Sequence, residues 1–176
     1  MERPIIIIFR GHPAGGKTTI YGALKKPLKD FIFIDNGDIK RTLAPLGKKR
    51  KGQFVNVKIA RQIAKEVLMF YMEKVMEQKG NIAIYEMSGD YVRKRLGPLI
   101  RRYHYQVYQF RPHSSLAAVM KRAKSQKRTM SENFLRKAWY GWATGKKAVE
   151  KDDIVLDTEK NSLKQCVNMV LKTIGR

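Results

Sequence analysis

Short, strongly apolar runs recur along the chain and are separated by longer segments whose apolar residues have helical spacing. The clearest run, Pro4–Phe9, is rich in β-branched residues, as in a strand buried on both faces of a parallel sheet. The predicted strands are Pro4–Phe9, Phe31–Ile34, Asn81–Tyr85, Tyr105–Phe110 and Ile154–Leu156. Strands that alternate with helices favour a doubly wound parallel sheet with helices on both faces.

The segments between these strands are predicted to be helices. The longest covers Gln53–Gln78, because apolar positions repeat there at helical spacing and Gly80 follows where a helix would end. Its expected buried face consists of Ile59, Ile63, Val67 and Phe70. The last helix begins at Ser162, with an expected buried face of Leu163, Val167, Val170, Leu171 and Ile174. The other predicted helices span about 17–24, about 93–102 with a break near Gly97-Pro98, 114–127 with Ser114 or Ser115 as N-cap, and 132–142.

Length and composition fit this pattern and exclude several classes of protein. With 176 residues, 43% of them hydrophobic and 30% charged, the chain suits one domain with a real core and not a disordered or fibrous protein. The longest apolar run, Ile5–Phe9, is far shorter than the ~20 residues of a membrane-spanning helix. We expect no membrane segment and no secretory leader. Because Cys166 is the only cysteine, a disulfide framework is excluded and a cytoplasmic location is expected.

Positive charge is the most unusual feature of the composition. The chain has 37 Lys and Arg residues against 15 Asp and Glu residues, which gives a formal net charge of +22. Acidic residues are absent from 39–65 and from 91–131, so the charge is also segregated along the chain. Such a surface attracts polyanions. Thermal adaptation is the simpler alternative, but it usually adds Glu together with Lys. We expect a nucleic acid as partner, RNA rather than DNA.

A glycine-rich motif, Gly11–Thr18, lies between the first predicted strand and the helix that follows it. Its spelling, G-x-x-x-x-G-K-[ST], together with this strand-loop-helix context, predicts a nucleoside triphosphate site. Glycines let the loop curl so that backbone N–H groups point at phosphate, and the helix N-terminus adds a favourable dipole. Lys17 would reach the β- and γ-phosphates, and the Thr18 hydroxyl would bind Mg²⁺. The predicted nucleotide-binding residues are Gly11, His12, Pro13, Ala14, Gly15, Gly16, Lys17, Thr18 and Thr19.

Two further candidates, Asp38 and Arg41, follow the second predicted strand. In a parallel sheet the carboxyl ends of the strands share one edge, so Asp38 would stand near the phosphates. A carboxylate there can accept the proton of an attacking hydroxyl, and Arg41, on the same helix face, can hold an anionic group. The alternative is that Asn36-Gly37 forms a turn and Asp38 only caps a helix. Spacing alone leaves both interpretations open.

The order of motifs along the chain resembles that of the small P-loop kinases. It consists of a strand, the G-x-x-x-x-G-K-[ST] motif, a second strand followed by D-x-x-R, and a basic segment further on. The chain is most similar to the polynucleotide kinase-like group, with zeta-toxin and chloramphenicol phosphotransferase kinases as relatives. The resemblance implies a three-layer α/β P-loop NTPase fold with a five-stranded, mainly parallel sheet. It implies a single kinase domain over 1–176 with a helical lid at about 112–145. It also implies that Asp38 is the general base and that Arg41 contacts the acceptor's phosphate.

The lid carries the remaining predicted catalytic residues, Arg122 and Arg128. The resemblance implies that lid arginines close over the transferring phosphoryl group, although the spacing to Arg128 is longer than expected. Glu86 follows the third strand where an aspartate is more usual, so it could orient a Mg²⁺-bound water, touch the acceptor or be a plain surface carboxylate. The aromatic residues Trp139, Tyr140 and Trp142 could stack on bases or belong to the core.

These features predict a kinase that uses ATP or GTP with Mg²⁺ and phosphorylates a hydroxyl of a nucleic acid, most simply a 5′-hydroxyl. A small-molecule kinase of the zeta-toxin or antibiotic-phosphotransferase type needs the same core but does not explain the charge. An RNA-associated NTPase that works as a switch is the third hypothesis. The D-x-x-R placement of Asp38 and Arg41 counts against it.

Overall fold

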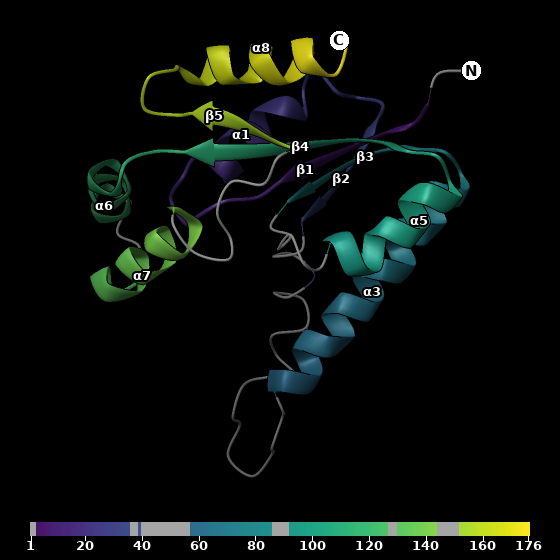
Figure 1. Ribbon diagram of the computed structural model, residues 1–176, viewed down its shortest axis with the longest axis horizontal. Coiled ribbons are helices and arrows are strands. Elements are labelled where there is room, and N and C mark those ends of the chain that lie inside the picture. Colours follow the sequence, from purple (N-terminus) through teal and green to yellow (C-terminus); the bar gives the residue numbers. More distant parts are fainter. Residues whose placement is uncertain (1–2, 36–38, 40–56, 86–91, 127–129, 144–151) are drawn as a thin grey trace.

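The computed structural model describes residues 3–35, 39, 57–85, 92–126, 130–143 and 152–176. At its centre is a five-stranded sheet in the order β2-β3-β1-β4-β5, and all four strand pairings are parallel (Figure 1). The strands are β1 (Ile5–Phe9), β2 (Phe31–Asp35), β3 (Asn81–Tyr85), β4 (Gln106–His113) and β5 (Asp153–Asp157). The predicted α/β class and the five predicted strands are confirmed.

Helices cover both faces of this sheet. The helices are α1 (Lys17–Leu24), α3 (Val57–Glu77), α5 (Gly97–Arg102), α6 (Leu116–Ser125), α7 (Glu132–Ala143) and α8 (Leu163–Thr173). Alternate residues of β1 point to opposite faces, as the pleat of a strand requires. Ile6 and Ile8 pack in the layer of α3, whereas Ile7 and Phe9 pack in the layer of α1 and α8. Helices α6 and α7 lie beyond the carboxyl end of β4, in the region of the predicted lid (Figure 1).

The helix starts follow the capping residues in the sequence. Ser115, one of the two predicted N-caps, caps α6, and its hydroxyl accepts a hydrogen bond from the Ala118 N–H at 3.2 Å. At the start of α8, Ser162 and Gln165 form a reciprocal capping box. The predicted break near Gly97-Pro98 is present as a change of helix type, from a π-helical turn over Val92–Leu96 to α5. Proline fits there because it stands in the first turn of α5, where its missing N–H costs nothing.

Strand β4 differs from its predicted range, since it begins one residue later and ends three residues later. The extension pairs with β5, with Pro112 opposite Leu156 and His113 opposite Asp157. Strand β1 has already ended opposite Phe110, so β4 is paired on one side only beyond that point. A residue without an N–H, such as Pro112, is tolerated where the strand is paired on one side only.

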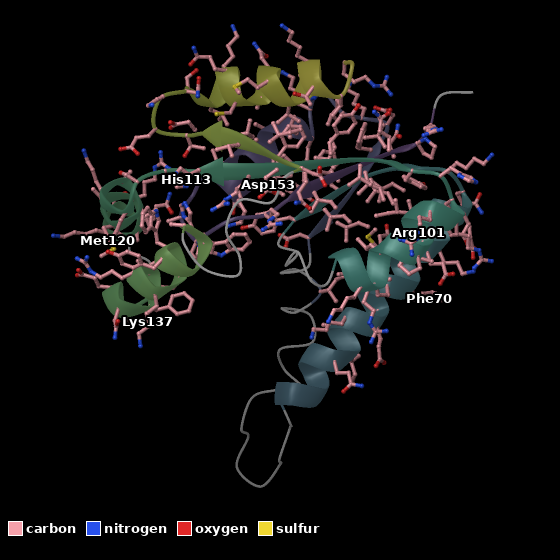
Figure 2. All side chains as sticks on the ribbon, viewed as in Figure 1. Phe70, Arg101, His113, Met120, Lys137 and Asp153 are labelled. Atoms are coloured by element: carbon pink, nitrogen blue, oxygen red, sulfur yellow. The ribbon has the colours of Figure 1, made fainter. Side chains whose placement is uncertain are left out.

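The predicted buried face of α3 is wrong at Ile63, Val67 and Phe70, which are exposed, and the Ile59 side chain lies outside the described residues. Val67 and Phe70 are 45% and 65% exposed, and Phe70 lies on the side of α3 that faces away from the sheet (Figure 2). The residues that α3 buries against the sheet are Ala64, Leu68, Met72, Val75 and Met76. Two apolar stripes run along this helix, and periodicity alone does not show which of them is buried against the sheet. The stripe with alanine and flexible methionines fits closely over the isoleucines of β1 and β3.

The start of the long helix was predicted at Gln53, and residues 53–56 lie outside the described residues. In the last helix the predicted face is confirmed at Val170 and Ile174, which are buried, but Leu163 is 43% exposed. Among the helices in the described part of the chain, none combines the length and apolarity needed to cross a lipid bilayer.

Candidate nucleotide-binding site

The Gly11–Thr18 loop connects β1 to α1 at the carboxyl edge of the sheet. Three of its residues, Gly11, Ala14 and Gly16, have positive φ angles of 141°, 58° and 95°. Gly16 is the residue on which α1 begins, so the first N–H groups of the helix face the interior of the loop. At Gly11, a side chain would bring its Cβ to 3.0 Å from the Pro112 carbonyl oxygen of β4. The loop therefore curls tightly against the end of β4, as the motif predicts.

His12 is folded beneath this loop and is only 1% exposed. Its Nδ1 lies 3.0 Å from the Pro13 carbonyl oxygen, and its ring stands edge-on to His113 at 5.6 Å between centroids. Burial, with a further effect of the Lys17 charge, lowers the pKa of His12 to about 4. The imidazole is therefore neutral near pH 7, and its Nδ1–H donates to Pro13. His12 therefore packs against the loop and stabilises its conformation.

The Lys17 side chain turns back over the loop. Its Nζ donates hydrogen bonds to the carbonyl oxygens of Gly11 at 2.9 Å and His12 at 2.8 Å. It also lies 5.9 Å from the centroid of the Tyr85 ring. An ammonium group in this place adds positive charge to a loop that already presents N–H groups. The predicted contact of Lys17 with the β- and γ-phosphates stays a prediction.

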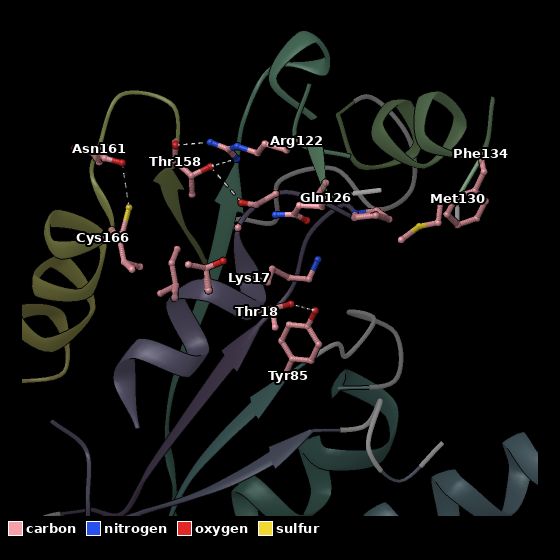
Figure 3. Close-up of a pocket in the computed structure, with 17 residues that line it drawn as sticks. Lys17, Thr18, Tyr85, Arg122, Gln126, Met130, Phe134, Thr158, Asn161 and Cys166 are labelled. Carbon is pink, nitrogen blue, oxygen red and sulfur yellow. Dashed lines mark hydrogen bonds between the residues drawn. The ribbon is translucent and has the colours of Figure 1, made fainter. Parts of the chain in front are cut away.

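Thr18, the predicted Mg²⁺ ligand, is exposed in the first turn of α1. Its hydroxyl lies 2.7 Å from the hydroxyl of Tyr85 (Figure 3). Sequence reasoning missed Tyr85, the last residue of β3. No sequence signal identifies this contact, because it depends on β3 lying beside β1, which places Tyr85 opposite Phe9.

A cavity of about 460 Å³ opens next to the loop (Figure 3). On one side it is lined by loop and α1 residues 13–20 and by Tyr85. The other lining residues come from the lid region, from the turn between β5 and α8, and from the first turn of α8. These residues are Arg122, Gln126, Met130, Phe134, Thr158, Asn161, Leu163 and Cys166. The cavity thus combines a polar end suited to phosphates with apolar side chains suited to a planar ring.

Arg122 joins the lid region to the turn after β5. Its Nη1 donates to the Thr158 hydroxyl at 2.9 Å and its Nη2 donates to the Thr158 carbonyl oxygen at 2.7 Å. The Thr158 hydroxyl is in turn 3.2 Å from the Gly15 carbonyl oxygen. Three segments far apart in the sequence therefore meet beside the cavity. The structure brings Arg122 to the same site as Lys17 and Thr18, although its predicted action on a phosphoryl group is untested.

Four predicted site residues, Asp38, Arg41, Glu86 and Arg128, lie outside the described residues. The aromatic residues of α7 have different environments. Trp142 is buried, Trp139 donates its Nε1–H to the Ser114 carbonyl oxygen at 2.9 Å, and Tyr140 is 52% exposed. Of the three, only Tyr140 has the exposure that base stacking needs.

A buried charged cluster lies behind the loop, and sequence reasoning missed it. Arg10 and Arg111, each 1% exposed, approach the Asp153 carboxylate at 3.6 Å and 3.8 Å. Asp153, labelled in Figure 2, also accepts a hydrogen bond from the Gln109 side chain at 2.7 Å. The two guanidinium carbons lie 5.2 Å and 5.7 Å from the Trp142 ring centroid. The cluster ties β1, β4, β5 and α7 together and so fixes the end of the sheet that carries the loop.

The donor set near the loop fits Mg²⁺ bound through phosphate. In the described part of the chain, no three His, Cys, Asp or Glu side chains come together as a metal-binding group. The Thr18 hydroxyl is an oxygen donor at the phosphate end of the cavity. Mg²⁺ commonly takes few protein ligands and completes its shell with phosphate oxygens and water. A loop with one hydroxyl ligand is adequate for such an ion.

Comparison with known proteins supports the fold. No model of a known protein family matches the chain, and no curated protein matches it. Among solved structures, a candidate kinase from Chloroflexus aurantiacus J-10-fl matches with a TM-score of 0.75 at 19% identity, over 99% of this chain and 98% of its own. The tunicamycin resistance protein of Deinococcus radiodurans matches with a TM-score of 0.68 at 15% identity, over 98% and 96% of the two chains. A gluconokinase from Sinorhizobium meliloti 1021 matches with a TM-score of 0.61 at 13% identity, over 100% and 94%.

At such identities the likeness establishes the fold. The chain has the three-layer α/β fold of the small P-loop kinases, as the sequence predicts, with a sheet that is parallel throughout. What the fold is used for has to be argued from the site.

Proposed function

We propose that the protein is a nucleoside triphosphate-dependent kinase. The observation that carries this proposal is the cavity that joins the Gly11–Thr18 loop to Arg122 and Thr158. A phosphate-binding loop alone occurs in switches and motors as well as kinases. Here the loop shares one cavity with a basic lid segment, so a cation also lies on the other side of the phosphoryl group that is to be transferred. Kinases use such cations to stabilise the charge on that group during transfer.

In this proposal the donor nucleotide places its phosphates at the loop and its base among the apolar residues that line the rest of the cavity. The N–H groups at the start of α1 and the Lys17 ammonium bind phosphate oxygens. The Thr18 hydroxyl holds Mg²⁺, which neutralises charge on the β- and γ-phosphates when bound. Arg122 closes the site from the lid side, fixed by its two hydrogen bonds to Thr158. The sequence favours neither ATP nor GTP.

The proposed acceptor is a hydroxyl of a nucleic acid, RNA before DNA. The support is the net charge of +22 and its segregation, together with the resemblance of the motifs to polynucleotide kinase-like proteins. In this assignment Asp38 takes the proton from the attacking hydroxyl, Arg41 binds a phosphate of the acceptor, and Arg128 joins Arg122 at the phosphoryl group. Glu86 would contact the acceptor or a metal-bound water.

A small-molecule acceptor is the second candidate. The support is that structures with the same fold include a gluconokinase, a sugar kinase and a tunicamycin resistance protein. The two candidates share the donor site and differ in the acceptor, so one experiment separates them.

The experiment measures transfer of ³²P from γ-labelled ATP or GTP, with Mg²⁺, to 5′-hydroxyl RNA and DNA oligonucleotides, total tRNA, nucleosides and sugars. We expect label on the oligonucleotides, less label at high salt, and none with Asp38→Asn. Asp30→Asn is the matched control, because Asp30 directly precedes β2, at the amino edge of the sheet and away from the Gly11–Thr18 loop. Label only on small molecules would establish the second candidate. Free phosphate without a labelled acceptor would refute both and leave an NTPase switch.

A further inference from the structure

The Thr18–Tyr85 contact links the end of the loop to the neighbouring strand β3, at 2.7 Å between the two hydroxyl oxygens. A threonine hydroxyl has one hydrogen to donate and two lone pairs to offer. When it ligates a cation it uses a lone pair, so its hydrogen must point elsewhere. The Tyr85 oxygen stands where it can accept that hydrogen.

Tyr85 is held in this place independently of any ligand. It ends β3 in register with Phe9 of β1 and Asp35 of β2, so its backbone is fixed from both sides. Its ring packs against Tyr21 at 5.5 Å between centroids, and the Tyr21 hydroxyl donates to the Ala83 carbonyl oxygen at 3.2 Å. The hydroxyl of Tyr85 is thus a rigid acceptor at the rim of the loop.

We infer that Tyr85 is a positioning residue that accepts the Thr18 hydrogen bond and so orients the Thr18 lone pairs toward the Mg²⁺ of a bound nucleotide. This inference rests on the proposed function, because it needs a nucleotide and its metal at the loop. Outer-shell partners of this kind commonly change metal affinity or activity by ~10–100-fold when they are removed. A hydroxyl without a fixed partner rotates among its staggered positions and loses that alignment.

The test measures nucleotide binding and not turnover. Fluorescent mant-ATP is titrated into the full chain in EDTA and at a series of Mg²⁺ concentrations. For Tyr85→Phe we expect the Mg²⁺ concentration at half-maximal enhancement of binding to rise ~10-fold. Affinity in EDTA should be unchanged, because the phenyl ring still packs on Tyr21. Tyr108→Phe, on strand β4 at the other side of β1, is the matched control and should behave as the unmodified protein does.

A double-mutant cycle separates this role from a general loss of structure. In a Thr18→Val background, which has no hydroxyl to orient, Tyr85→Phe should have no further effect on the Mg²⁺ titration. An effect of Tyr85→Phe that persists in this background would contradict the inference, and so would a Mg²⁺ titration that overlays that of the unmodified protein. A lower Mg²⁺ concentration at half-maximal enhancement in Tyr85→Phe would show that Tyr85 donates its hydrogen to Thr18. This result would also contradict the inference. If the unmodified protein does not bind mant-ATP, the proposed function fails together with the inference.

Discussion

Gly15 offers the most stringent test of the loop geometry, because it is the point where a single methyl group has the least room. A Cβ added there would lie 2.9 Å from His12 Cε1 and 3.1 Å from the Pro112 carbonyl oxygen. Neither neighbour can retreat easily. His12 is buried and bonded to Pro13, and the Pro112 oxygen belongs to the backbone of β4.

The expected cost of Gly15→Ala follows from these distances. Both contacts fall several tenths of an ångström inside ordinary van der Waals separation, so the loop or the His12 ring must shift. Overpacking of this kind costs ~1–3 kcal/mol. For a chain of this length, each kcal/mol lowers the melting temperature by ~2–4 °C, so the fall should be ~2–12 °C. Because the shift moves the N–H groups of the loop, nucleotide affinity should fall ~10-fold or more, which corresponds to ~1.4 kcal/mol.

Gly22→Ala is the matched control in the same segment. Gly22 lies in α1, and a Cβ there would have nothing within 4 Å. Alanine in a helix is more stable than glycine by ~0.5–1 kcal/mol, so this variant should melt slightly higher and bind nucleotide normally. The assay combines thermal unfolding with mant-ATP titration. Equal melting temperatures and affinities for Gly15→Ala and the unmodified protein would refute the described packing of the loop.

Three further predictions concern stability and the cavity wall. The folded pKa of His12, about 4, lies below its ordinary 6.5, so the unfolded chain binds more protons between these pH values and stability falls as the pH drops from 6.5 to 4. Denaturant unfolding at pH 7, 5 and 4 should show a loss of up to ~3 kcal/mol that is smaller in His12→Asn. Leu68→Ala should destabilise the protein by ~2–5 kcal/mol in the same assay at pH 7, whereas Phe70→Ala on the exposed face of α3 should change stability by less than ~1 kcal/mol. Arg122→Lys keeps the charge but loses the paired contact with Thr158, so mant-ATP affinity should fall ~10-fold, and an unchanged affinity would contradict the role of Arg122 in the cavity wall.

The strands and the loop could be predicted because their signals are local. Ile5–Phe9 is buried on both faces, so its composition alone marks it as a central strand. The Gly11–Thr18 motif is likewise contained in eight consecutive residues. Helix starts at Ser115 and Ser162 were predictable for the same reason, since each cap bonds to an N–H three residues further on.

Features that depend on residues far apart in the sequence could not be predicted. The face that α3 buries depends on the shape of the isoleucine surface of β1 and β3, and the helix sequence alone offers two apolar stripes. Tyr85 meets Thr18 only because β3 lies beside β1, a pairing that alternation of strands and helices does not specify. The ties between Arg122 and Thr158, and between Asp153 and its two arginines, also need the strand order.

The central claim is that the cavity beside the Gly11–Thr18 loop binds a nucleoside triphosphate, and calorimetric titration of a non-hydrolysable ATP or GTP analogue with Mg²⁺ tests it directly. We expect saturable binding by the unmodified protein, with one nucleotide per chain, and its loss in Lys17→Ala, which removes the ammonium group. Absence of binding by the unmodified protein with both analogues, or equal affinity in Lys17→Ala, would contradict the account.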